Sequence, residues 1–328
     1  MKNRLIIILS AILLCLTSNA QTIDYLGIES RGSFLQQTKD GNGYSDLRAE
    51  YFNIQMRGTV TKNVTYNIRQ RMNIPIDSEN PFRATDLLSI TWNPIPKWSL
   101  TAGKTSVLIG GYEYDSAPID VYFYSQFCTN LQQAFAFAIN SDYEFMPGQS
   151  FLVQVCNSPL SSGFQDAYSY NAAWSGNIGG WLHTIWSCNM VEDLDHNFIN
   201  YLALGNHMTF GGLAFDIDLF HRASPRQEKF FFSDYSIISK LIWATGNWNW
   251  CAKAGYEQNE AFNVDASGKS FDTVIPAGTR YFYGGAGIEY FPKGNQNIRF
   301  HLAYFRNNYD HTNNISLGIK WAVDIIKK

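Results

Sequence analysis

The sequence predicts an all-β protein, a transmembrane antiparallel β-barrel of about 16 strands with a long in-folded constriction loop. Three observations predict this fold. Apolar and polar residues alternate along most of the chain, short turns alternate with longer polar loops, and aromatic residues are frequent whereas charged residues are few. Of the 328 residues, 16% are aromatic and 16% are charged, against about 25% charged in typical soluble domains. Beyond the N-terminus no apolar run approaches the roughly 20 residues that a membrane helix needs, which excludes a helical membrane protein.

The N-terminus has the pattern of a secretory signal. Residues 1–20 begin with two basic residues, Lys2 and Arg4, continue with an apolar stretch, and end with small residues before a cleavage point after Ala20. An anchoring helix is the alternative, but the apolar stretch is too short for it. We therefore expect a signal peptide at 1–20 and a single outer-membrane β-barrel domain over 21–328.

Alternation with period two, typical of strands with one apolar face, then follows to the end of the chain. The clearest example is the last strand, where Ile315, Leu317 and Ile319 alternate with polar or small residues. The segments with this pattern are 22–37, 44–60, 63–75, 85–93, 97–107, 132–145, 149–157, 168–177, 180–191, 197–209, 211–222, 233–245, 247–259, 278–291, 297–308 and 312–324.

The connections between these segments favour a membrane barrel over a soluble β-sandwich. Short turns and longer polar loops alternate, as they do in antiparallel strands that cross the outer membrane. A soluble barrel of this size would enclose a lumen that its own side chains cannot fill. Five tryptophans lie near predicted strand ends, where aromatic girdles meet lipid headgroups: Trp92, Trp98, Trp181, Trp248 and Trp321.

The longest connection, residues 107–131, is too apolar and too rich in aromatic residues to be a solvated surface loop. The next strand places Ala134, Ala136 and Ala138 on its inner face, which leaves space inside the barrel. We therefore expect this loop to fold into the lumen and narrow it. The alternative is a loop that folds over the outer rim and packs on neighbouring loops.

Three short motifs in and before this loop carry a resemblance to a known family: Gly103-Lys104, the run from Gly110 to Asp115, and the run from Pro118 to Tyr122. With them the chain resembles outer-membrane porins of the phosphate-selective porin O/P type. The resemblance implies a sixteen-stranded, often trimeric channel with both termini in the periplasm of a Gram-negative bacterium. We expect outer-membrane lipid around it and passive diffusion of small hydrophilic solutes or ions through it.

The charges differ from what a phosphate filter needs, because dehydrating a phosphate must be offset by cationic donors. From Thr105 through His221 the chain has no Lys or Arg. The candidate constriction residues are the loop carboxylates Glu113, Asp115 and Asp120. The candidate opposing basic wall, assigned by strand parity, consists of Arg69, Arg71, Arg299 and Lys320.

This arrangement predicts a transverse field across a pore that is neutral to mildly cation-selective. One alternative is that the charges pair with each other and simply hold the loop in place. A phosphate- or anion-selective channel is another, as is a non-conducting structural, adhesive or enzymatic barrel. No Ser–His pairing follows from strand spacing, and no histidine pair has metal-ligand spacing on one strand, so we expect no enzyme, cofactor or metal.

The formal net charge of −3 also disfavours nucleic-acid binding. Parity directs Cys156, Cys188 and Cys251 into the lumen, and Cys128 on the long loop could form a disulfide with Cys156 or Cys188 that tethers the loop. Isolated thiols are the alternative.

Overall fold

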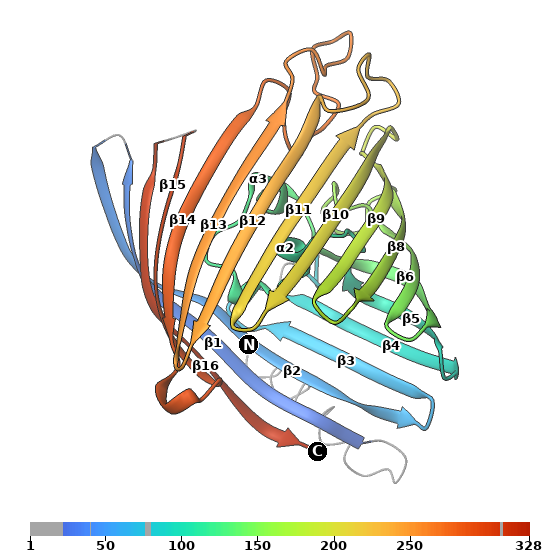
Figure 1. The fold of residues 1–328 in the computed structure, drawn as a ribbon. Coiled ribbons are helices and arrows are strands. Elements are labelled where there is room, and N and C mark those ends of the chain that lie inside the picture. Colours follow the sequence, from blue (N-terminus) through green and yellow to red (C-terminus); the bar gives the residue numbers. More distant parts are fainter. Residues whose placement is uncertain (1–21, 40, 76–79, 309–310) are drawn as a thin grey trace.

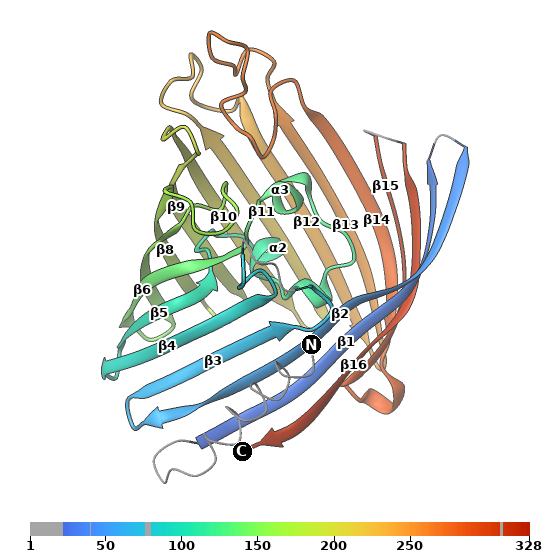
Figure 2. The same cartoon turned by 180° about the vertical axis from the view of Figure 1, so that it is seen from behind.

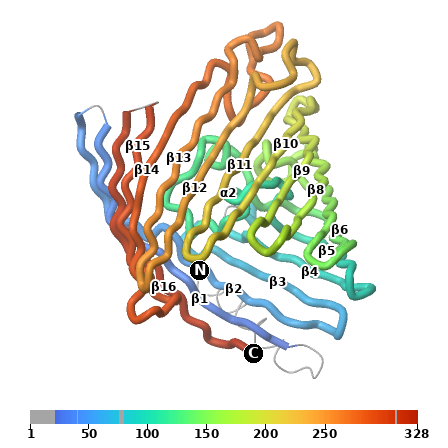
Figure 3. Tube along the Cα trace, in the orientation of Figure 1, coloured from blue at the N-terminus to red at the C-terminus, as the bar shows by residue number. Residues whose placement is uncertain are grey.

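The computed structural model describes residues 22–39, 41–75, 80–308 and 311–328, so the predicted signal peptide lies outside the described residues. The described residues form a closed barrel in which each of sixteen strands pairs antiparallel with the next and β1 pairs with β16 (Figures 1 and 3). The predicted fold class is confirmed. No helix of the described part is long and apolar enough to cross a membrane.

The strands are β1 (Thr22–Lys39), β2 (Asn42–Thr61), β3 (Val64–Arg71), β4 (Thr85–Ile95), β5 (Trp98–Ser106), β6 (Phe135–Met146), β7 (Gln149–Asn157), β8 (Tyr168–Ile178), β9 (Leu182–Glu192), β10 (Phe198–Phe210), β11 (Leu213–Ala223), β12 (Asp234–Thr245), β13 (Trp248–Asn259), β14 (Arg280–Tyr290), β15 (Ile298–Asn307) and β16 (Asn313–Lys327). Each predicted segment corresponds to one strand. The last strand runs three residues further than predicted, because β1 offers it hydrogen bonds as far as the Tyr25–Lys327 pair.

Side chains are distributed as in a protein whose outer surface faces an apolar solvent. The five predicted girdle tryptophans are all exposed on the outside of the barrel, as are many Leu, Ile and Phe side chains. Charged side chains such as Arg31, Lys104 and Glu257 are buried instead. This inversion of the usual pattern is typical of a barrel with an apolar band outside and a polar lumen inside.

One parity prediction is wrong. Cys188 is exposed on the outer face of β9, whereas Ser187 and Asn189 on either side of it are buried inside. Cys188 shares its outward face with the exposed Trp186 and Met190, so its side chain points away from the lumen. All four cysteines of the described chain are free, so no disulfide tethers the loop.

The long connection between β5 and β6 enters the lumen, and its short helices α2 (Tyr112–Asp115) and α3 (Gln126–Asn130) lie inside the barrel (Figure 2). The predicted in-folding is confirmed. The loop is apolar because it packs on the barrel wall: Phe127 is fully buried and stacks on Phe220 at 4.4 Å between ring centroids. Gly111 has φ of 105°, and a Cβ there would meet the Phe220 ring at 2.5 Å, so this close approach requires glycine.

Candidate functional site

We call residues 107–134 the constriction loop. Two acidic side chains of the wall cap the starts of its short helices. Asp218 on β11 accepts hydrogen bonds from the backbone N–H groups of Tyr112 and Glu113, both at 2.8 Å. Glu257 on β13 accepts from the N–H groups at the start of α3 at 2.6 and 3.0 Å. Helices of four and five residues are not stable alone, so the wall determines the conformation of the loop.

Glu113, the first predicted constriction residue, is used to attach the loop. Its carboxylate accepts from the Lys253 ammonium at 2.8 Å and from the Ser125 N–H at 2.7 Å. The same ammonium donates to the Phe123 carbonyl at 2.7 Å. Glu113 therefore joins both halves of the constriction loop to β13 and does not present a free charge to the lumen.

Asp120, the second predicted residue, is also tied to the wall. It pairs with Arg299 of β15 at 2.9 Å and with Lys320 of β16 at 2.6 Å. Burial acts to raise the pKa of Asp120, but the two cations outweigh burial and lower it. At Glu113 and Asp120 the loop carboxylates therefore pair with basic residues of the wall and hold the loop in place, which was the alternative to a free transverse field.

Arg31 on β1 makes a further attachment that the sequence did not indicate as a site residue. Its guanidinium donates to the carbonyls of Ile119 at 2.7 Å and Val121 at 2.9 Å. It also pairs with Glu50 on β2 at 2.6 Å, and its side chain is almost fully buried. Removing Arg31 would leave these loop carbonyls without their donor.

The third predicted carboxylate, Asp115, lies beside a cavity of about 1020 Å³ on the side of the long loops. Among the described residues it has no ion pair, and burial raises the pKa of this loop side chain. Arg69 and Arg71 line the same cavity and share Asp86 at 3.0 and 2.9 Å. The remaining basic side chains of this cavity are Arg83 and Lys104. Four cations and two carboxylates make this side of the constriction positive.

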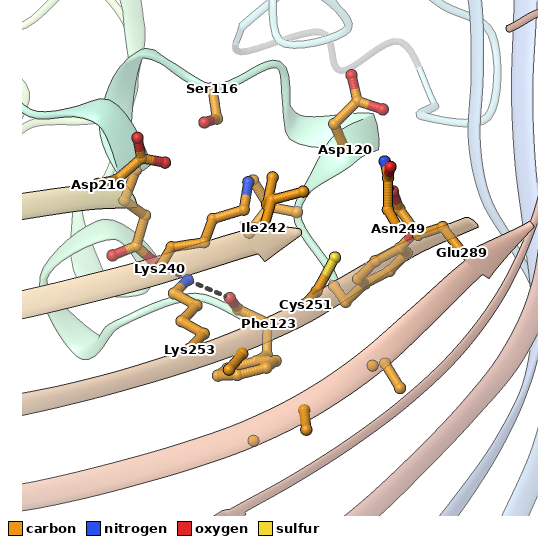
Figure 4. Close-up of a pocket in the computed structure, with 18 of the residues that line it drawn as sticks. Ser116, Asp120, Phe123, Asp216, Lys240, Ile242, Asn249, Cys251, Lys253 and Glu289 are labelled. Atoms are coloured by element: carbon orange, nitrogen blue, oxygen red, sulfur yellow. Dashed lines mark hydrogen bonds and ion pairs between the residues drawn. The ribbon is translucent and has the colours of Figure 1, made fainter. Parts of the chain in front are cut away.

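A second cavity of about 420 Å³ lies on the side of the short turns (Figure 4). It holds Arg299 and Lys320 of the predicted basic wall, so the structure divides that wall between the two cavities. Four basic side chains and five carboxylates line this cavity. Ser116 lines both cavities, which therefore meet at the constriction loop.

The other candidate constellations take part in local contacts. In the loop after β9, Asp195 pairs with Lys269 and His196 pairs with Glu192. No group of three or more His, Cys, Asp or Glu side chains in the described ranges could hold a metal ion.

Comparison with known proteins gives one family and many similar folds. Residues 25–185 match the family described as phosphate-selective porin O and P. No curated protein matches the chain. Among solved structures, the chain is similar to an anion-selective porin from Comamonas acidovorans, with 10% identity, 92% of this chain and 100% of that chain covered, and a TM-score of 0.64.

Two further solved structures are similar over nearly the whole chain. OmpTdeltaL8, a loop-deletion mutant of an outer membrane protein of Vibrio cholerae, has 12% identity and a TM-score of 0.60, covering 93% of this chain and 100% of its own. OccD3 of Pseudomonas aeruginosa has 10% identity and a TM-score of 0.57, covering 94% and 92%. At such low identity these likenesses show a common barrel fold.

Proposed function

We infer, from the match to the phosphate-selective porin O and P family over residues 25–185 together with the sixteen-stranded barrel, that this chain is an outer-membrane porin. The predicted resemblance and the predicted porin are confirmed at this level. Small hydrophilic solutes or ions pass through the barrel by diffusion. The selectivity, the oligomeric state and the processing described below are our proposals.

We propose that the constriction gives the pore a weak preference for anions. The observation that carries this proposal is the division of charge at the loop: Glu113 and Asp120 are occupied by wall cations, whereas Arg69 and Arg71 share the single carboxylate of Asp86. The sequence-based expectation of mild cation selectivity counted all three loop carboxylates as lumen charges. Only Asp115 remains in that position, and it faces a net positive cavity.

We propose a channel rather than an enzyme. His301, the lumen histidine with polar neighbours, hydrogen-bonds to Ser316 at 3.2 Å and stacks on Tyr122 at 4.4 Å between ring centroids. It is almost completely buried under the constriction loop, so a substrate would not reach it. This histidine supports the position of the loop.

We also propose how the chain is processed and how it lies in the membrane. Residues 1–20 are a signal peptide that is removed during export, and residues 21–328 are one barrel domain surrounded by outer-membrane lipid. The short turns face the periplasm and the long loops face outward, as in other outer-membrane barrels of a Gram-negative cell. The family resemblance supports a homotrimer.

Proteoliposome swelling tests the porin directly. Vesicles containing the folded barrel should swell in neutral sugars, faster in a pentose than in a trisaccharide, because the constriction loop limits the passage of larger solutes. Vesicles with heat-denatured protein are the control. Absence of swelling with every sugar would contradict a general diffusion pore.

A further inference from the structure

Lys240 on β12 points into the short-turn cavity below the constriction loop (Figure 4). The other three cations of this cavity are paired: Lys253 with Glu113, and Arg299 and Lys320 with Asp120. Lys240 has no ion pair or hydrogen bond to another side chain of the described chain within the usual distances. Its cross-strand neighbour Asp216 contacts the His207 Nδ1 atom through Oδ1 at 2.5 Å. The cavity therefore contains one ammonium group that is available to a solute.

The wall next to Lys240 is apolar, which is unusual for a water-filled lumen. Ile238 and Ile242 lie on the same inner face of β12, two residues to either side of Lys240. Cys251 on β13 is the cross-strand partner of Ile242, and Phe123 of the loop and Phe291 complete the apolar lining. Replacing water at this surface by an apolar group lowers the free energy by about 25 cal/mol for each Å² of apolar surface that is covered.

We propose that the short-turn cavity is a binding subsite for amphipathic monocarboxylates, small molecules with one carboxylate and an apolar ring or chain. The carboxylate binds the Lys240 ammonium, and the apolar body lies against Ile242, Cys251 and Phe123. This inference rests on the proposed porin, because it assigns a solute class to the same lumen. It gives the pore a preferred solute in addition to general diffusion.

The charge balance of the cavity selects for a single negative charge. Five carboxylates line it, among them Asp216 and Glu289. A doubly charged anion such as hydrogen phosphate would be repelled by them while gaining only one unpaired cation. A monocarboxylate requires one ammonium, and the apolar wall supplies the rest of its binding free energy. An apolar neutral molecule would leave the ammonium unused.

Block of the KCl current in planar bilayers, by phenylacetate compared with acetate, tests the subsite. Both carry one carboxylate, and only phenylacetate has an apolar body. Phenylacetate should block at a concentration at least tenfold lower than acetate. Lys240→Gln should weaken the phenylacetate block by about two- to fivefold, the upper part of the range expected for a partly exposed ion pair. Ile242→Asn should weaken the phenylacetate block but not that of acetate.

Lys97→Gln is the matched control, since it removes the same charge from an exposed short turn outside the cavity. Equal block by the two anions, or equal block of the parent and Lys240→Gln, would overturn the subsite. If the parent gives no KCl current, the proposed porin fails. Saturation-transfer NMR of phenylacetate with the barrel in detergent then still tests the subsite: a signal that Lys240→Gln reduces supports it, and no signal overturns it.

Discussion

Replacing Glu113 by Gln should loosen the constriction loop while the barrel stays folded. The ion pair of Glu113 with Lys253 spans 2.8 Å, and the two side chains are only 3% and 11% exposed. Gln keeps a side-chain oxygen that can accept from the Ser125 N–H, but it leaves the Lys253 charge without its partner. Breaking a buried ion pair by removing one member costs about 3–5 kcal/mol.

We take the lower end of that range, because Lys253 keeps its hydrogen bond to the Phe123 carbonyl. A cost of about 3 kcal/mol raises the population of the displaced loop by roughly 100-fold, since each 1.4 kcal/mol is a factor of ten. Single-channel recording should show this as larger open-state noise and transient steps to higher conductance. The temperature at which the barrel unfolds in detergent should change little, because the strand ladder of hydrogen bonds is unaltered.

Glu144→Gln is the matched control, because Glu144 lies beside an exposed short turn far from the loop. The double variant Glu113→Gln with Lys253→Gln removes both charges, and it should recover part of the quiet open state, since no uncompensated charge remains. A Glu113→Gln channel as quiet as the parent would refute the attachment role of this ion pair. So would a double variant whose noise is the sum of the two single variants.

Three further predictions follow from the charges and thiols of the lumen. Replacing Arg69 and Arg71 together by Gln should move the reversal potential in a KCl gradient toward cation selectivity, and an unchanged potential would contradict their role. Because burial raises the pKa of Asp115, its carboxyl takes up a proton at a higher pH than an ordinary carboxylate. Lowering the pH from neutral to about 5 should therefore increase anion selectivity, and Asp115→Asn should show that increase already at neutral pH and respond less to acid. A water-soluble thiol reagent should react with Cys251, which lines the lumen, and so reduce the conductance. Cys188 should react only with a reagent that partitions into lipid. Loss of the conductance effect in Cys251→Ser checks the assignment.

The strands could be predicted from the sequence because alternation is local. A strand with one face toward lipid and one toward water must alternate, so each of the sixteen segments is visible without knowing its neighbours. The sequence also indicated that an apolar loop must be buried somewhere, and the alanines of β6 indicated where there was room. In the structure Ala136 and Ala138 are buried under the loop.

The partners of the loop could not be predicted, because they lie far away in the chain. Glu113 and Lys253 are 140 residues apart, and their pairing depends on how far the loop reaches across the lumen. The sequence could have indicated Arg31, since Glu29, Arg31 and Ser33 alternate with outward residues of β1. No pattern in the sequence indicates that Asp218 would cap a helix of the loop.

The buried charge network at the long-loop end was missed for the same reason. Arg222 of β11 is fully buried and pairs with Asp234 at 2.6 Å and with Asp272 at 2.9 Å. Asp272 belongs to the connection between β13 and β14, which therefore folds back onto the barrel. A loop carboxylate can be assigned to such a site only when the three-dimensional position of its loop is known.

The preference of the pore for anions is measured by the reversal potential of the purified barrel in a planar bilayer under a KCl gradient, repeated with phosphate added. We expect a stable conductance with a weakly anionic reversal potential, because the long-loop cavity holds more cations than carboxylates. A cationic reversal potential would contradict the neutralisation of Glu113 and Asp120 by the wall. Absence of any conductance would contradict the porin itself.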